Sequence, residues 1–312
     1  MIANYFETTY SLDIFAPEID SLEGVMARLY PDLFNSLLAQ NAMTAFRALL
    51  DLFARRLADT TNTLHATKSR YLYRILASLL ARGTDPCDIT IITFNQDLQA
   101  EKVLLHLSKA KRWQPHSPQL FAFPALYAVP VANWTRVSAP AAADKFPEST
   151  HLGACLQVLK LHGSMNWYST HTSQTPSREA LFNRTRRLSV TTRTEIASRG
   201  IIQGLRTVYA FPVVVPPITH KSSVMPASLG PLWALAERRL IEADDVVIFG
   251  YSCPALDFES ANMLARAQRQ RPKASTLSVI DPNGSVAARY ANLLAPTRLN
   301  YYKNADAFLT AQ

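Results

Sequence analysis

The chain has 312 residues, enough to bury a sizeable core, and its 48% hydrophobic and 18% charged residues exclude an intrinsically disordered protein. Its net charge of +8 favours anionic partners such as nucleotides, nucleic acid or acidic protein surfaces. No apolar run approaches the roughly 18 residues of a membrane-spanning helix. The start, MIANYFETTYSLDIF, lacks the basic residues and apolar block of a secretion signal. We therefore expect a cytoplasmic protein that does not contact membranes.

Residues 1–85 are predicted to form a helical N-terminal segment that packs on the rest of the protein. Apolar residues recur at spacings of three and four through residues 31–61, which is the period of an amphipathic helix. Residues 67–83 repeat this pattern and stop at Gly83, a residue type that commonly ends helices.

After residue 85 the pattern changes to short apolar runs separated by helix-like segments. The runs lie at 89–94, 155–161, 211–216, 245–250 and 276–281. Strands rich in valine and isoleucine that alternate with helices predict a mostly parallel sheet covered by helices on both faces, an α/β fold. We expect one such domain over 86–312, with insertions at about 111–150 and 169–210.

The second expected insertion is rich in arginine. Seven arginines lie between Arg178 and Arg206, against the two acids Glu179 and Glu195. Two interpretations stay open: a solvated loop or helix, or a contact with phosphate or nucleic acid, since guanidinium groups suit phosphate oxygens.

The three cysteines, Cys87, Cys155 and Cys253, are odd in number and far apart. Without a Cys-x-x-Cys pair, the sequence predicts neither a zinc site nor a disulfide framework. We expect each cysteine to pack as a small hydrophobic residue, and we expect no bound metal.

Polar residues follow four of the predicted strands. In an open α/β sheet the ligand crevice lies beyond the carboxyl ends of the strands, so these residues are expected to share one edge, with His162 displayed there and not buried. Local roles remain as alternatives, namely helix capping, close packing at a glycine, and a type I turn. The segments are Asn95-Gln96-Asp97, His162-Gly163, Gly250-Tyr251-Ser252 and Asp281-Pro282-Asn283-Gly284.

Four segments resemble those of sirtuin-like NAD-consuming domains, in the same order and particularly in the bacterial antiphage branch. They are TIITFNQD, VLKLHGSMNWY, ADDVVIFGYSCPALDFESANMLARA and LSVIDPN, and the resemblance covers roughly residues 86–290. It implies a Rossmann-like sheet and a hydrolase that converts NAD to nicotinamide and ADP-ribose as an antiphage defence effector. It also implies assembly into a homo-oligomer.

The resemblance implies a role for each matching residue. Asn95 orients water and ribose at the scissile bond, Asp97 holds the nicotinamide or its ribose, and His162 is the general base for a ribose hydroxyl. Trp167 either walls the pocket or is a core aromatic residue. The implied NAD-binding residues, from the phosphates to the adenosine end, are Gly163, Gly250, Tyr251, Ser252, Asp281 and Asn283.

The chain departs from the family pattern in two respects. It lacks the four-cysteine zinc module, which disfavours protein deacetylation and implies that no zinc is bound. It also lacks the Gly-x-Gly loop that cradles the pyrophosphate, because no two of its nine glycines are separated by one residue.

Two explanations of the missing loop stay open. Either the NAD site is incomplete, or an arginine of 178–206 or a neighbouring subunit replaces the loop. The alternative function is therefore a catalytically incomplete module that binds a nucleotide or serves as an assembly scaffold, beside an ATPase or a nucleic-acid-binding partner.

Overall fold

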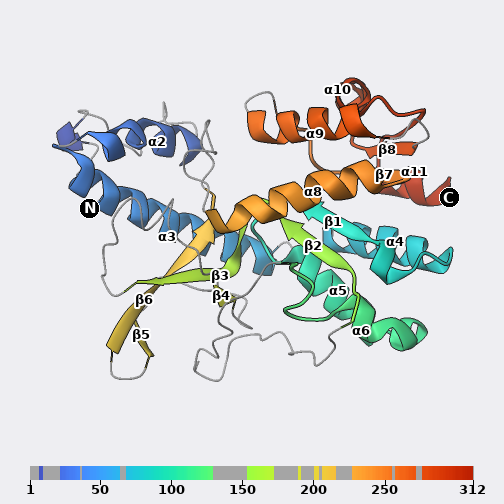
Figure 1. The fold of residues 1–312 in the computed structure, drawn as a ribbon, viewed down its shortest axis with the longest axis horizontal. Helices are drawn as coiled ribbons and strands as arrows, with labels where there is room; N and C mark the ends of the chain where they lie inside the picture. The colour runs from blue at the N-terminus through green and yellow to red at the C-terminus, as the bar shows by residue number, and fades with distance from the viewer. Residues whose placement is uncertain are drawn as a thin grey trace.

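The computed structural model has a mixed α/β architecture in which small parallel sheets are interleaved with helices, and helices form the N-terminal part (Figure 1). This confirms the coarser prediction of an α/β chain with a helical start, whereas the described strands form three small sheets and not one mostly parallel sheet. In the described part of the chain, no helix is both long and apolar enough to span a membrane. The residues that the structure describes are 7–9, 22–35, 37–63, 68–128, 153–171, 189–190, 200–203, 206–215, 227–254, 257–271 and 276–311.

The N-terminal helices are α2 (Leu22–Leu29), α3 (Ala39–Thr63) and α4 (Lys68–Ala81). The helix α3 buries Phe46 and Leu49 on its apolar face, as the sequence period predicts. Beyond α4 the chain closes a Schellman turn, in which Gly83 N–H donates to the carbonyl of Leu80 and Thr84 N–H to that of Leu79. The φ of +88° at Gly83 explains why a glycine ends this helix.

The parallel strands form two separate sheets. One contains β1 (Thr90–Thr93) and β2 (Gln157–Lys160), and the other has the order β7-β8-β9. Three strands make up the second sheet: β7 (Asp245–Phe249), β8 (Thr276–Ile280) and β9 (Arg298–Tyr302). The strand β9 is not among the predicted strands, because its tyrosine and asparagine residues interrupt any continuous apolar run.

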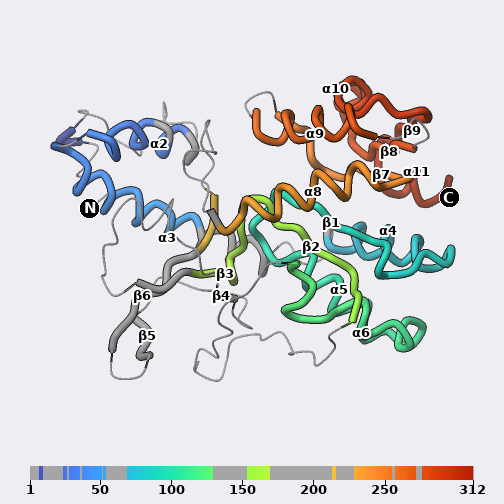
Figure 2. The backbone as a smooth tube through the Cα atoms, in the orientation of Figure 1, coloured from blue at the N-terminus to red at the C-terminus, as the bar shows by residue number. Residues whose placement is uncertain are grey.

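Helices connect and cover these strands. They are α5 (Gln99–Lys109), α8 (Gly230–Glu242), α9 (Phe258–Gln270), α10 (Gly284–Leu294) and α11 (Ala305–Thr310). Figure 2 shows that α4 and α11, far apart in sequence, run beside each other. Arg74 of α4 and Asp306 of α11 form an ion pair of 2.5 Å, and Ile75 and Phe308 pack in a small core with Ile280.

The prediction that residues 211–216 join the parallel sheet is wrong. These residues belong mainly to β6 (Arg206–Val214), which pairs antiparallel with β3 (Gly163–His171) in a sheet of order β4-β3-β6-β5. The other members are β4 (Ser189–Val190) and β5 (Gly200–Gln203). An apolar run indicates a buried strand but not the direction of its partner, which explains the error.

A turn at His162 and Gly163 sends the chain from β2 into β3. Gly163 has a φ of +79°, and a Cβ atom there would lie 2.0 Å from the carbonyl oxygen of Val213. Only glycine fits this close approach of two backbones. Apart from the end of β3 and short pieces in β4, β5 and β6, the second expected insertion and its arginine-rich stretch lie outside the described residues.

Part of the first expected insertion belongs to the core. Residues 111–128 contain a 3₁₀ helix, Lys111–His116, and α6 (Ser117–Leu120), and they bury Phe123 and Tyr127 completely. The amide of Val158 in β2 donates to the carbonyl of Leu126 over 2.8 Å, so this segment covers the outer edge of β2. Residues 129–150 lie outside the described residues.

Candidate functional site

The carboxyl ends of β1 and β7 lie side by side. Phe94, directly after β1, stacks on Tyr251, which follows β7, with ring centroids 4.1 Å apart and planes 22° apart. This contact brings the Asn95 and Gly250 segments together at one edge of the two parallel sheets, as expected from strands that run in the same direction.

His162 lies behind this aromatic pair. Its imidazole is 5.3 Å from the Phe94 ring and 6.0 Å from the Trp233 ring of α8, measured between centroids. It is only 5% exposed, so the expectation of a displayed imidazole is wrong. The indole N–H of Trp233 donates to the carbonyl of Leu161 over 2.9 Å, which holds this ring against the turn after β2.

Asn95 and Asp97 have different surroundings. Asn95 is exposed, and its backbone N–H donates to Thr93 Oγ1 over 3.1 Å. Asp97 Oδ1 accepts the backbone N–H of Gln99 over 3.1 Å, a local bond just before α5, whose N-cap is Leu98 without a side-chain cap. The side-chain amide of Gln96 donates to the carbonyl of Val215 over 3.0 Å and anchors the segment from the other side.

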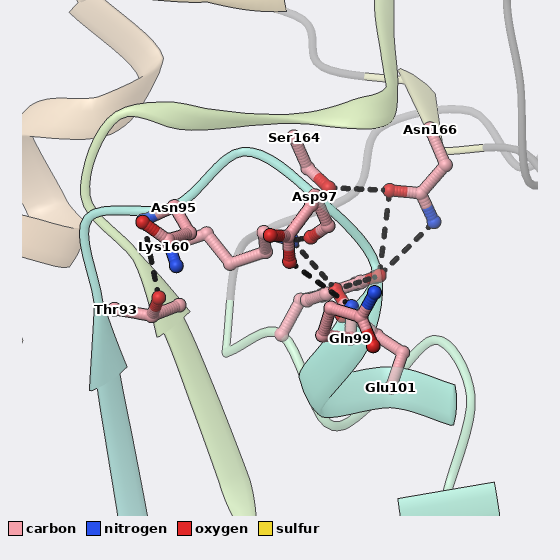
Figure 3. Close-up of polar contacts among 9 residues, drawn as sticks. Thr93, Asn95, Asp97, Gln99, Glu101, Lys160, Ser164 and Asn166 are labelled. Carbon is pink, nitrogen blue, oxygen red and sulfur yellow. Dashed lines mark hydrogen bonds and ion pairs between the residues drawn. The ribbon is translucent and has the colours of Figure 1, made fainter. Parts of the chain in front are cut away.

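A buried ion pair lies next to the segment Asn95-Gln96-Asp97 (Figure 3). Lys160 at the end of β2 and Glu101 of α5 are both fully buried, with Nζ 3.0 Å from Oε1. The Lys160 ammonium also donates to the backbone carbonyl of Asp97. The lysine therefore connects the end of β2 to the loop that follows β1. Sequence reasoning missed this pair, although a lysine inside the apolar run VLKL is the signal that indicates it.

Neutral polar side chains complete the network around Glu101. The Tyr127 hydroxyl donates to Glu101 Oε1 over 2.8 Å and accepts from Asn166 Nδ2 at 3.0 Å. Ser164 Oγ donates to Asn166 Oδ1 over 2.8 Å. Burial, together with the nearby Glu101 carboxylate, raises the pKa of Tyr127 well above its ordinary value. The hydroxyl thus stays protonated as a donor to Glu101.

Trp167 lies next to this network and is fully buried, with its ring 5.0 Å from that of Tyr127 in an edge-to-face contact. Of the two interpretations of Trp167, the structure therefore supports the core aromatic residue and not a pocket wall.

The segment after β7 is held by helices α9 and α10. Tyr251 donates from its hydroxyl to Asp257 Oδ2 over 2.6 Å, and its carbonyl accepts from Tyr290 over 2.9 Å. Arg289 donates to the carbonyl of Ser252 over 2.7 Å. Burial, followed by the bond to Asp257, raises the pKa of Tyr251. Gly250 is exposed with a φ of +67°, and a Cβ atom there would meet no other atom within 4 Å.

Asp281 and Asn283 form a local turn and helix cap at the end of β8. Asp281 Oδ1 accepts the backbone N–H of Asn283 over 2.8 Å, and Asn283 Oδ1 accepts that of Ser285 over 3.0 Å. These bonds match the turn alternative, and Asn283 caps α10.

A cavity of about 630 Å³ extends along β1 and β7. Among the predicted site residues, Asn95, Gly250 and Tyr251 line it, whereas His162 and Asp97 do not. The structure thus divides the predicted site into a lined cavity, a buried imidazole behind Phe94, and a separate turn after β8.

Among the described residues, no group of three His, Cys, Asp or Glu side chains is arranged to hold a metal ion. The three cysteines are free thiols. Comparisons of the chain with protein-family models, with curated proteins and with solved structures gave no match.

Proposed function

We propose that the two parallel sheets are halves of one Rossmann-like sheet, and that the protein cleaves NAD to nicotinamide and ADP-ribose at the carboxyl edge. One observation carries the proposal: the stack of Phe94 on Tyr251 joins the ends of β1 and β7, with Asn95 and Gly250 lining the same cavity. Doubly wound sheets bind dinucleotides at such an edge.

The proposed reaction breaks the bond between the ribose C1′ and the nicotinamide nitrogen, and its electron pair leaves with the neutral nicotinamide. Water adds to C1′ of the oxocarbenium-like sugar and loses a proton, which yields ADP-ribose. Asn95 has an exposed amide suited to orienting that water without adding a charge. His162 is the proposed base for a ribose hydroxyl.

The burial of His162 sets a condition on this reaction. The Phe94 ring contacts the imidazole edge-on and also stacks on Tyr251. Phe94 and Tyr251 line the cavity, so the Phe94 ring lies between His162 and the cavity. A rotation of the Phe94 side chain is therefore part of the proposal. Catalytic contacts commonly tighten only when the substrate is bound, and the unliganded geometry agrees with this requirement.

A second candidate is a catalytically incomplete module that binds a nucleotide or serves as a scaffold. The buried imidazole and the missing Gly-x-Gly loop favour it specifically. Under this candidate the edge residues hold a nucleotide without cleaving it. The antiphage role, the cytoplasmic location, the homo-oligomer and an ATPase or nucleic-acid-binding partner belong to both candidates as untested predictions from the resemblance.

The test measures NAD binding by calorimetry and the release of nicotinamide and ADP-ribose by chromatography. We expect release by the wild type and its loss in Asn95→Ala and His162→Ala, while the control His116→Ala, at an exposed histidine, stays active. Binding without release in any protein supports the incomplete module. Absence of binding at millimolar NAD contradicts the NAD reaction and favours the scaffold form of the second candidate.

A further inference from the structure

The inner edges of the two parallel sheets face a common cavity. In the described part of the chain β1 pairs with β2 and β7 pairs with β8, and neither strand has a second ladder. The cavity is lined from Thr90 to Asn95 on one side and by every residue from Asp245 to Tyr251 on the other. Each edge presents backbone N–H and C=O groups that a further strand would pair.

Burial distinguishes these two strands from their neighbours. All four residues of β1 are only half-buried, and Phe249 of β7 is 36% exposed, although both sequences are largely apolar. By contrast, Leu159 of β2 and Val279 of β8 are completely buried. Strands of parallel sheets are normally buried on both faces, so β1 and β7 have the exposure of strands that lack a neighbour.

The cavity is lined by several elements and not by one sheet alone. Leu240 of α8, Met263 of α9 and Tyr290 of α10 line it together with the strand edges. These helices provide an apolar floor beneath the gap, which is the environment that a parallel strand requires.

The strand directions define how an additional strand would run. Asp88 and Asp244, before the two strands, line one end of the cavity, and Phe94 and Tyr251, after them, line the other. The strands are therefore parallel, and one strand between them would give the order β2-β1-inserted strand-β7-β8-β9. In doubly wound sheets this central place belongs to the first strand, which is followed by the glycine-rich phosphate loop. The sequence lacks that same loop.

We propose that this cavity, the strand slot, is the docking site for one extended β-strand donated by a partner polypeptide. The proposal goes beyond the NAD reaction, and only the Gly-x-Gly turn of the donated segment rests on the proposed nucleotide site. The donated strand has about five residues, since β7 has five and a parallel strand rises about 3.3 Å per residue. Its side chains are apolar, because Ile92, Val246 and Ile248 line the slot.

Charge and glycine content further define the partner segment. The amino-terminal end of the slot is lined by four carboxylates, from Asp88, Glu242, Asp244 and Asp245, against the one guanidinium of Arg239 among the lining residues. A parallel strand enters at this end, so basic residues precede its apolar part. A Gly-x-Gly turn follows it, because close-approach glycines at this position bring backbone amides to a phosphate.

The path of the chain favours a separate donor. The N-terminal helices α2 and α3 lie at the end of the molecule opposite β7, β8 and β9 (Figure 1). The helix α3 has 25 residues and is therefore about 38 Å long. We therefore assign the donated strand to a separate polypeptide, and the exchange measurement below distinguishes it from a segment of this chain.

The test uses the full chain and a fluorescein-labelled peptide, Lys-Lys-Val-Val-Ile-Val-Gly-Ser-Gly-Ser, titrated by anisotropy. We expect saturable binding and slower hydrogen exchange at 90–93 and 245–249, without change in β9. The control peptide has proline in place of isoleucine, which removes one ladder donor, and its affinity should be at least about tenfold lower.

Matched variants locate the site. Ile92→Asp and Ile248→Asp should each lower the affinity for the peptide by about tenfold or more, since they bury a carboxylate against the strand. The control Leu299→Asp, at a 42% exposed position on β9, should bind normally. Circular dichroism verifies folding, and the comparison of the two peptides on the wild type stands even where a variant unfolds.

Three results would overturn the proposal: no saturable binding, equal affinity for the proline peptide, or amides of β1 and β7 that exchange as slowly as those of β8 in the chain alone. The last would mean that the chain fills the slot with its own segment. None of these measurements involves NAD, so failure of the strand slot is distinguishable from failure of the NAD reaction.

Discussion

The two edges of the β1–β2 sheet have different surroundings, since one is covered by a neighbouring segment and the other lines a cavity. At the outer edge, residues 121–128 cover β2, and the amide of Val158 finds the carbonyl of Leu126. Behind the same strand, Lys160 is paired with Glu101 and the Asp97 carbonyl, and the Tyr127 hydroxyl donates to Glu101. At the inner edge, β1 faces a cavity across from β7. On one side a buried lysine and carboxylate are paired, although Glu101 Oε2 has no hydrogen-bond partner among the described residues. On the other side, β1 has no second ladder within the part of the chain that the structure describes.

The largest effect on stability is expected at the buried Lys160–Glu101 pair. Lys160→Met leaves the fully buried Glu101 without its cation and should lower the free energy of unfolding by about 3–5 kcal/mol. The double variant Lys160→Met/Glu101→Leu should recover much of this loss, because it removes both charges. Urea unfolding of the two variants measures the difference. Equal losses in both would show that packing, and not the unpaired charge, dominates.

A smaller effect on the free energy of unfolding should distinguish β7, which lines the cavity, from its buried neighbour β8. Ile280→Ala in β8 removes a side chain that is 2% exposed and should cost about 2–4 kcal/mol. Ile248→Ala in β7 removes a half-buried side chain beside the cavity and should cost about 1 kcal/mol. Thermal or urea unfolding measures both. If Ile248→Ala costs as much as Ile280→Ala, β7 is packed like an interior strand and the contrast disappears.

The smallest effect concerns the reactivity of the Cys87 thiol, which lines the cavity. Burial, followed by the Asp85 side chain, raises the pKa of Cys87 from 9.0 to about 11. The raised value keeps the thiol protonated, so at pH 8 iodoacetamide should label Cys87 about tenfold more slowly in the folded chain than in urea, since the smaller thiolate fraction is partly offset by its higher nucleophilicity. The folded-chain rate should increase with pH until about 11.

Mass spectrometry assigns this label, and Cys87→Ser provides the control that removes it. Equal labelling of folded and unfolded chains at pH 8 would contradict the assigned environment. A further decrease on addition of the slot peptide would connect the thiol to the same cavity.

Local patterns accounted for part of the site. The segments after β1, β7 and β8 were found because polar residues interrupt apolar runs, and Asp97 and Asn283 bond to nearby amides within their own segments. Such bonds depend on neighbours along the chain, so the sequence indicates them directly. Glu101 was missed because its partner Lys160 lies 59 residues away and their pairing depends on how α5 packs against β2.

His162 illustrates the opposite case. Its place after an apolar strand predicts a position at the sheet edge, and it does lie there, but its exposure depends on Phe94 and Trp233, which come from distant elements. The same limit applies to residues 211–216, whose apolar pattern is equally suited to a parallel or an antiparallel partner.

By itself, the sequence determined the helical start, the glycine that ends α4, the α/β class and the turns that follow the strands, because these depend on residue propensities and short-range periodicity. Tertiary structure alone decided the antiparallel pairing of β3 with β6, the burial of His162, the Lys160–Glu101 pair and the cavity that β1 and β7 line. These features arise from contacts between residues far apart in the chain, whose energies no local pattern encodes.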